Sequence, residues 1–132
     1  MKANSNDIAD YRKQMWVNDE TVFDKNAALE INANEEEFLK ELAEMFIYGL
    51  PEEMSSIKKA VHSRDNNALE KSAHKLKGAV ANFGNNTVFK VALSLEMMGK
   101  ENRLEDVEEA YGALTKETVR LVNALRNFIK SR

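Results

Sequence analysis

The side chains best suited to chemistry lie together in segment 72–84, which reads SAHKLKGAVANFG. His74 is followed by Lys77 at i+3 and by Gly78 at i+4, so on a helix the three positions share one face. An exposed imidazole titrates at about pH 6.5, and much of it is a neutral nucleophile near neutral pH. A neighbouring ammonium would offset negative charge on transferring phosphoryl oxygens. The arrangement therefore suits nucleophilic attack on phosphorus.

Gly78 is an unusual choice for the interior of a helix. Glycine there costs about 1 kcal/mol relative to alanine, and no turn is needed at this point. A missing side chain one turn after His74 gives an approaching protein or a tetrahedral phosphoryl group room to reach the ring. Two plainer interpretations stay open. Gly78 permits close helix packing or is merely tolerated, and His74 with Lys77 is an ordinary surface pair.

Other kinds of site lack essential parts. His62 has no lysine or glycine at the same spacing and is interpreted as a solvated or C-capping residue. A di-iron bundle needs Glu-x-x-His, but Lys59 and Lys71 stand three residues before the two histidines. The sequence has no glycine-rich phosphate loop and no serine triad pattern. We therefore expect no metal, no ATP site and no cofactor of the chain's own.

Composition limits the class of protein further. The chain has 132 residues, enough for one domain, and no cysteine, which excludes disulfides and thiolate sites. Nineteen basic and 22 acidic residues give a net charge of -3, which argues against nucleic acid as a partner. The polar N-terminus and short apolar runs predict a soluble, cytoplasmic protein without a membrane span. One proline and five glycines favour long helices and an all-α fold.

The first long helix is predicted to start at Asn34, an N-cap residue followed by the acidic segment 35–37. Pro51 interrupts the apolar pattern without any loop composition, so we expect a kink and not a break. Segment 63–67 reads as the first loop. The stripe of this helix is predicted to comprise Phe38, Leu42, Met45, Phe46, Gly49, Met54, Ile57, Lys58 and Val61.

Three further helices follow from the apolar spacing. One runs from Ala68 to Phe83 and stops at Gly84, and the next is capped by Asn86 and closed by Gly99. The last covers about 103–130. Their predicted core positions are Leu69, Ala73, Leu76, Val80 and Phe83, then Val88, Val91, Ala92, Leu95 and Met98, then Leu104, Val107, Tyr111, Leu114, Thr118, Leu121, Leu125 and Phe128 or Ile129.

Four amphipathic helices must bury their stripes against one another, which predicts an up-down four-helix bundle with a short N-terminal helical extension. Residues 22–132 would form the bundle and residues 1–21 an extension or linker. Short helices are predicted over about 7–16 and after Asp24. Because the stripes are almost wholly apolar, a bundle that binds a metal or a small molecule is disfavoured.

The run 73–78, followed by Gly84, resembles the signature of histidine-containing phosphotransfer (HPt) domains, in which His-x-Leu-Lys-Gly lies on a bundle helix. Segment 38–52 is similar to the family's preceding helix with its proline. Leu-Glu at 95–96 resembles the pair on the following helix. The resemblance covers about 22–129.

This resemblance implies roles for individual residues. His74 would be phosphorylated, Lys77 would support the phosphoryl charge, and Gly78 would leave the docking face open. The family often places a polar residue of the next helix near the histidine, and Glu96 or Lys100 could take that place. An acid there would repel phosphate, so the choice between these two stays open.

The resemblance also implies the partners. The phosphoryl donor and acceptor would be aspartates of response-regulator receiver domains, which bring Mg²⁺, and a histidine kinase would stand upstream. The domain itself would be a monomeric carrier and not an enzyme, with contacts around His74 that include Ala81. It is either freestanding or the C-terminal domain of a hybrid sensor histidine kinase. The competing hypothesis, a non-catalytic helical interaction module, predicts that His74 is buried or blocked.

Overall fold

The computed structural model describes residues 22–84 and 86–131. This part of the chain contains helices and no strand, which confirms the all-α class. The short helix predicted over about 7–16 and the extension predicted for 1–21 lie outside the described residues. The elements in order are α2 (Lys25–Ile31), α3 (Glu36–Ser63), α4 (Asn66–Val80), the 3₁₀ turn η1 (Ala81–Phe83), α5 (Thr87–Lys100) and α6 (Val107–Lys130).

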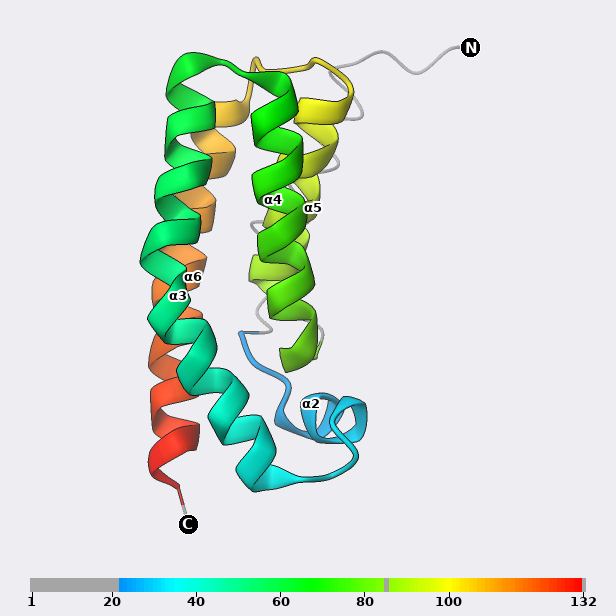
Figure 1. The fold of residues 1–132 in the computed structure, drawn as a ribbon, viewed down its shortest axis with the longest axis vertical. Coiled ribbons are helices and arrows are strands. Elements are labelled where there is room, and N and C mark those ends of the chain that lie inside the picture. The colour runs from blue at the N-terminus through cyan, green and yellow to red at the C-terminus, as the bar shows by residue number, and fades with distance from the viewer. Residues whose placement is uncertain (1–21, 85, 132) are drawn as a thin grey trace.

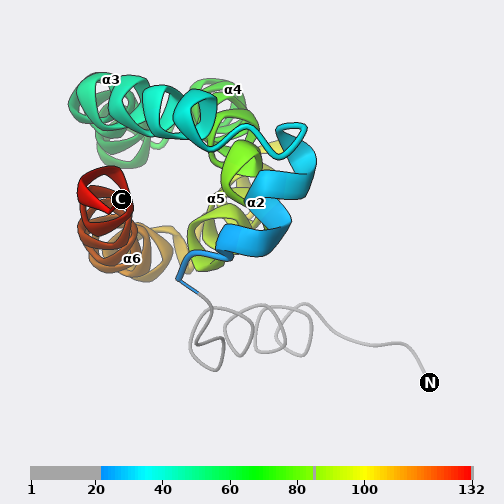
Figure 2. The same cartoon turned by 90° about the horizontal axis from the view of Figure 1, so that it is seen from below.

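The four long helices surround one apolar core. Each contacts two neighbours, so that α4 packs between α3 and α5, and α6 closes the ring between α5 and α3. Figure 1 shows the four helices side by side, with the short α2 lying against one end. There α2 contacts η1 and the start of α3 (Figure 2). None of the other helices in the described part of the chain covers the remaining face of α4.

Aromatic side chains close the end of the core that α2 covers. The ring of Phe83, in η1, lies 5.3 Å from that of Phe46 and 6.5 Å from that of Phe23, in edge-on arrangements. Such pairs add about 0.5–1.5 kcal/mol each beyond the burial of their area. They hold the C-terminal end of α4 against α3.

The apolar stripe predicted for the first long helix is wrong in part. The buried row of α3 contains Leu39, Phe46 and Leu50, whereas Phe38 is 45% exposed and Met45 is 69% exposed. Two rows of apolar side chains run along α3, displaced by about one residue. Packing against α4 and α6 selects one row for the core, and the sequence pattern alone does not distinguish them.

The course of α3 agrees with the prediction at its proline but not at its start. The helix continues through Pro51 without a break, and Figure 1 shows that it bends along its length. Its N-cap is Glu35 and not Asn34. Both Ala33 and Asn34 adopt left-handed backbone conformations, with φ of 57° and 59°, and therefore belong to the preceding turn.

Both ends of α4 are set by local chemistry. The side chain of Asp65 accepts a hydrogen bond from the Ala68 backbone N–H at 3.0 Å, so the helix begins at Asn66, two residues earlier than predicted. Only Arg64 and Asp65 form the loop. At the other end the α-helix was predicted to continue to Phe83, but it stops at Val80 and is followed by η1. Gly84, with φ of 80°, ends η1.

The later helices also differ from the prediction at their ends. Asn86 caps α5 as predicted, its side chain accepting from the Phe89 N–H at 2.9 Å. Gly99 lies inside α5 and does not close it, and α6 begins at Val107 and not near 103. A Cβ on Gly99 would lie 2.6 Å from the Asn66 carbonyl oxygen. Glycine at this position therefore allows α4 and α5 to approach closely.

We expect Gly99→Ala to lower the free energy of unfolding by about 2 kcal/mol, because the added methyl group overpacks the contact with α4. Urea unfolding measures the change. The matched control is Gly112→Ala on α6, where a Cβ meets nothing within 4 Å. That variant is expected to gain about 0.5–1 kcal/mol from helix propensity. Equal stability of Gly99→Ala and the unchanged protein would contradict the packing argument.

Candidate functional site

His74 stands on the free face of α4. Its neighbours Ala73 and Leu76 are fully buried in the core, while the His74 side chain is 66% exposed. The competing hypothesis of a non-catalytic module required a buried or blocked ring. The observed exposure therefore argues against that hypothesis and leaves the imidazole open to a partner.

Glu96, on the neighbouring helix α5, joins His74 and Lys77. One carboxylate oxygen, Oε2, lies 2.7 Å from His74 Nδ1, and the other, Oε1, lies 2.6 Å from Lys77 Nζ. A carboxylate can only accept hydrogen bonds, so the imidazole carries its proton on Nδ1. The lone pair then resides on Nε2. The site thus presents a nucleophilic nitrogen in a defined tautomer.

The two side chains that contact Glu96, Lys77 and His74, keep its carboxylate ionised. Partial burial raises the pKa of Glu96, but hydrogen bonds from Lys77 and His74 and the positive charge of Lys77 outweigh this effect, and its pKa is lowered. The contacts are therefore present near neutral pH and are lost only as the pH falls through that lowered pKa. The Lys77 ammonium, 2.6 Å from Oε1, balances the negative charge of this carboxylate.

Gly78 leaves open space beside the ring. It is exposed, and a Cβ built on it would meet nothing within 4 Å. Close packing of helices, one of the plainer interpretations of this glycine, therefore does not explain it. The bare backbone one turn after His74 is available to whatever approaches the imidazole.

The remaining predicted site residues, Ala81 and Lys100, lie at opposite ends of the site. Ala81 is exposed at the start of η1, three residues after Gly78. Lys100 is exposed at the end of α5, toward the N-terminal end of α4 because the two helices run antiparallel. Within the described residues no hydrogen bond or ion pair joins Lys100 to His74. Of the two candidates on α5, Glu96 is the one that contacts the histidine.

A shallow hollow of about 430 Å³ lies beside the ring, on the side facing α5. His74 and Glu96 line it together with Asn67, Glu70 and Lys71. Sequence reasoning did not select these last three residues as part of the site. Their spacing could have indicated this, because they lie one and two turns before His74 on the same helix and therefore on the same face.

Two further observations concern the described residues as a whole. In segments 22–84 and 86–131 no three histidine or acidic side chains cluster as metal ligands would. No helix in these segments combines the length and apolar character needed to cross a bilayer. His62 is exposed in the last turn of α3, where a cation interacts favourably with the helix dipole.

Comparison with known proteins gives three matches. Residues 41–128 match the family model described as the Hpt domain. The chain is 26% identical over 109 residues to the phosphorelay intermediate protein rdeA of Dictyostelium discoideum, covering 83% of this chain but 43% of that protein. The chain therefore spans less than half the length of this relative.

The third match is to a solved structure. The histidine-containing phosphotransfer protein B of Pseudomonas aeruginosa superposes with a TM-score of 0.75 at 18% identity. The match covers 86% of this chain and all of that one, and it shows a shared fold. The resemblance drawn from segment 73–78 is confirmed by the family model, which includes this segment.

Proposed function

Because this chain belongs to the Hpt domain family, we propose that it is a phosphorelay intermediate in two-component signalling. His74 accepts a phosphoryl group from a receiver-domain aspartate and passes it to the aspartate of another receiver. The observation that carries this proposal is the exposed His74 ring, with Nδ1 held by Glu96 and Nε2 without a contact to any other described residue.

The transfer follows from this geometry. The Nε2 lone pair attacks the phosphorus of the aspartyl phosphate, the nitrogen–phosphorus bond forms, and the aspartate carboxylate leaves with the electron pair of the broken bond. The ring becomes positively charged because it keeps its proton on Nδ1. Glu96 stabilises that charge through the 2.7 Å hydrogen bond. Reversal of the same steps delivers the phosphoryl group to the next receiver.

The other site residues act around this step. We propose that Lys77, through its contact with Glu96, keeps the site from repelling the incoming phosphoryl group. Gly78 leaves the surface beside His74 open, and Ala81 extends that surface along the helix. Lys100, at the end of α5, lies at the edge of the site around His74. Mg²⁺, which phosphoryl transfer from aspartate requires, would come from the receiver and not from this chain.

The wider setting is proposed on the same basis. The chain would be a monomeric carrier in the cytoplasm with an up-down four-helix bundle over 22–132, preceded by an extension or linker at 1–21. It would have no ATP site, would bind neither nucleic acid nor membrane, and would receive phosphoryl groups that originate from a histidine kinase. It is either a freestanding protein or the C-terminal domain of a hybrid sensor kinase.

The test is transfer from a charged receiver. Receiver domains are phosphorylated with radiolabelled acetyl phosphate, freed of the small donor and mixed with this protein. We expect the label to move to this chain in a linkage that acid hydrolyses and base does not, as is characteristic of phosphohistidine. Failure of every receiver in a broad panel to transfer label would contradict the proposal.

The role of Glu96 has a separate test. Glu96→Gln keeps the size and one acceptor oxygen but removes the charge, so we expect transfer to His74 to slow by about tenfold. Nitrogen-15 spectra of the imidazole should show a loss of the tautomer protonated on Nδ1, and the pH profile of transfer should shift. Glu70→Gln is the control, because it removes a charge from the same hollow. An unchanged tautomer and rate in Glu96→Gln would rule out this positioning role.

A further inference from the structure

The hollow beside His74 contains a cation to which the proposed transfer assigns no part. Lys71, three residues before His74, lines this hollow of about 430 Å³ together with the ring. Residues three apart on a helix lie on one face. A helical side chain also leans toward the N-terminus of its helix, so the His74 ring leans over the turn that holds Lys71. The hollow is large enough to take a phosphoryl group attached to the ring.

The other lysine of the site is already engaged. Lys77 Nζ lies 2.6 Å from Glu96 Oε1, and the Lys77 side chain is only 21% exposed. The two opposite charges offset each other. A phosphoryl group brings about two further negative charges near neutral pH. While Lys77 stays with Glu96, another cation is needed to approach the phosphoryl oxygens.

Lys71 is free to make this approach. It is exposed, and within segments 22–84 and 86–131 its ammonium forms no hydrogen bond and no ion pair. The lysine ammonium is a compact charge with three donors on a flexible four-carbon stem. From one turn before His74 it can turn toward oxygens bound at Nε2 without breaking a contact to any described residue.

The other groups of the hollow offer no competing cation. Apart from His74, the hollow is lined by Asn67, Glu70, Lys71 and Glu96. The two acids repel a phosphoryl group, and the asparagine amide is neutral. Lys100 is exposed at the end of α5, but it does not line the hollow. Among the described residues that line the hollow, Lys71 is therefore the one permanent cation.

We propose that Lys71 binds the phosphoryl group once it is attached to His74, its ammonium donating a hydrogen bond to a phosphoryl oxygen in the hollow. This inference rests on the proposed function and adds the residue that holds the transferred group. Because the contact exists only in the phosphorylated state, it shifts the transfer equilibrium toward the phosphorylated carrier. Lys71 thus sets how much of the carrier is phosphorylated, while Lys77 neutralises Glu96.

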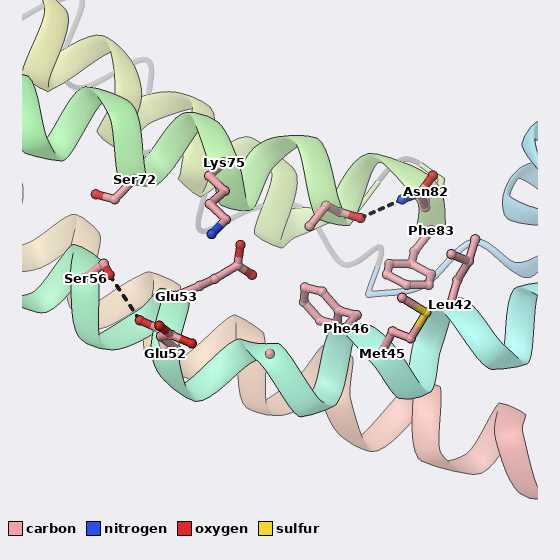
Figure 3. A pocket seen from close by; sticks show the side chains of 12 residues that line it. Leu42, Met45, Phe46, Glu52, Glu53, Ser56, Ser72, Lys75, Asn82 and Phe83 are labelled. Atoms are coloured by element: carbon pink, nitrogen blue, oxygen red, sulfur yellow. Dashed lines mark hydrogen bonds between the residues drawn. The ribbon is translucent and has the colours of Figure 1, made fainter.

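The test compares the two exposed lysines of α4. Lys71→Gln removes the ammonium and keeps a similar helix propensity, and Lys71→Arg keeps the charge. Lys75→Gln is the matched control, because Lys75 points toward Glu53 in a recess between α3 and α4 and does not line the hollow (Figure 3). Both glutamine variants lose one positive charge close to His74, so only a direct contact distinguishes them. Circular dichroism checks that each variant folds.

The first readout is the equilibrium of transfer from a charged receiver. The label on each protein is measured after equilibration, at concentrations too low for the two proteins to stay bound, so the result does not depend on docking. We expect Lys71→Gln to lower the equilibrium constant for transfer to His74 by about fivefold, the upper end of what an exposed ion pair contributes. Lys75→Gln and Lys71→Arg should leave this constant unchanged.

The second readout needs no receiver. Phosphoramidate phosphorylates His74 directly: its phosphorus–nitrogen bond breaks as the bond to Nε2 forms, and ammonia leaves. Phosphorus NMR then follows the last ionisation of the bound phosphoryl group. An ammonium in contact favours the fully ionised form, so the phosphoryl pKa should be higher in Lys71→Gln than in the unchanged protein. The difference should shrink in about 1 M salt, where the Debye length is about 3 Å.

Three results would overturn the inference. Equal equilibrium constants and equal phosphoryl pKa values in Lys71→Gln and the unchanged protein would exclude the contact. An effect of the same size in Lys75→Gln would show a general loss of charge, and a lasting defect in Lys71→Arg would exclude the charge as the cause. The proposed function fails separately: if phosphoramidate phosphorylates the unchanged protein but no receiver does, the phosphorelay role is rejected, and the phosphoryl pKa alone decides whether Lys71 holds the group.

Discussion

Replacing His74 by glutamine is expected to reduce receiver-dependent labelling to background while leaving thermal unfolding nearly unchanged. The amide of glutamine is not a nucleophile for phosphorus, so the step has no acceptor atom. The side chain is 66% exposed and forms a hydrogen bond with Glu96, so little packing is lost. Radiolabel transfer and circular dichroism measure the two effects on the same preparation.

His62→Gln is the matched control for this substitution. It removes the chain's other histidine, which is also exposed on a helix, and it should keep full labelling. Label that persists in His74→Gln would reject the assignment of His74. Loss of label in both variants would point to a general effect of histidine substitution and not to one acceptor.

Gly78→Leu is expected to give a protein that is more stable and yet accepts poorly. Leucine should improve helix stability by about 0.8 kcal/mol, because open space surrounds this position. The branched side chain would lie one turn from His74 on the docking face and hold the receiver away from the ring. Since a displacement of about 1 Å in a transfer reaction can cost about a hundredfold, we expect a loss of that order in transfer from receivers.

Gly112→Leu separates the two effects of that change. It offers the same gain in helix propensity at an equally open position on α6. We expect unfolding measurements to show similar stabilisation in both variants and transfer assays to show a loss only in Gly78→Leu. Normal transfer by Gly78→Leu would remove the steric argument for the glycine.

The core of the proposed site could be predicted from sequence because its members share one helix. His74, Lys77 and Gly78 need only the helical repeat to be placed on one face. The partner of the ring could not be chosen in this way. Glu96 and Lys100 were both compatible with the pattern, and the register between α4 and α5 places Glu96 beside His74.

The remaining differences have similar physical causes. On α3 two neighbouring apolar rows compete for the core, and contacts with other helices decide that Leu39 is buried while Phe38 is exposed. The starts of α3 and α4 depend on single backbone conformations at Asn34 and Arg64, both of which have positive φ. Such conformations leave little trace in a periodic pattern, so the predicted starts of these two helices were displaced by one or two residues.

The most direct test of the central claim is to locate the phosphoryl group on the ring. The protein is labelled with nitrogen-15, phosphorylated by a receiver, and studied by long-range proton–nitrogen correlation spectra with phosphorus detection. We expect a single phosphohistidine at His74, with phosphorus on Nε2 and the proton retained on Nδ1 beside Glu96. Phosphorus on Nδ1, on His62 or on no histidine would contradict the account.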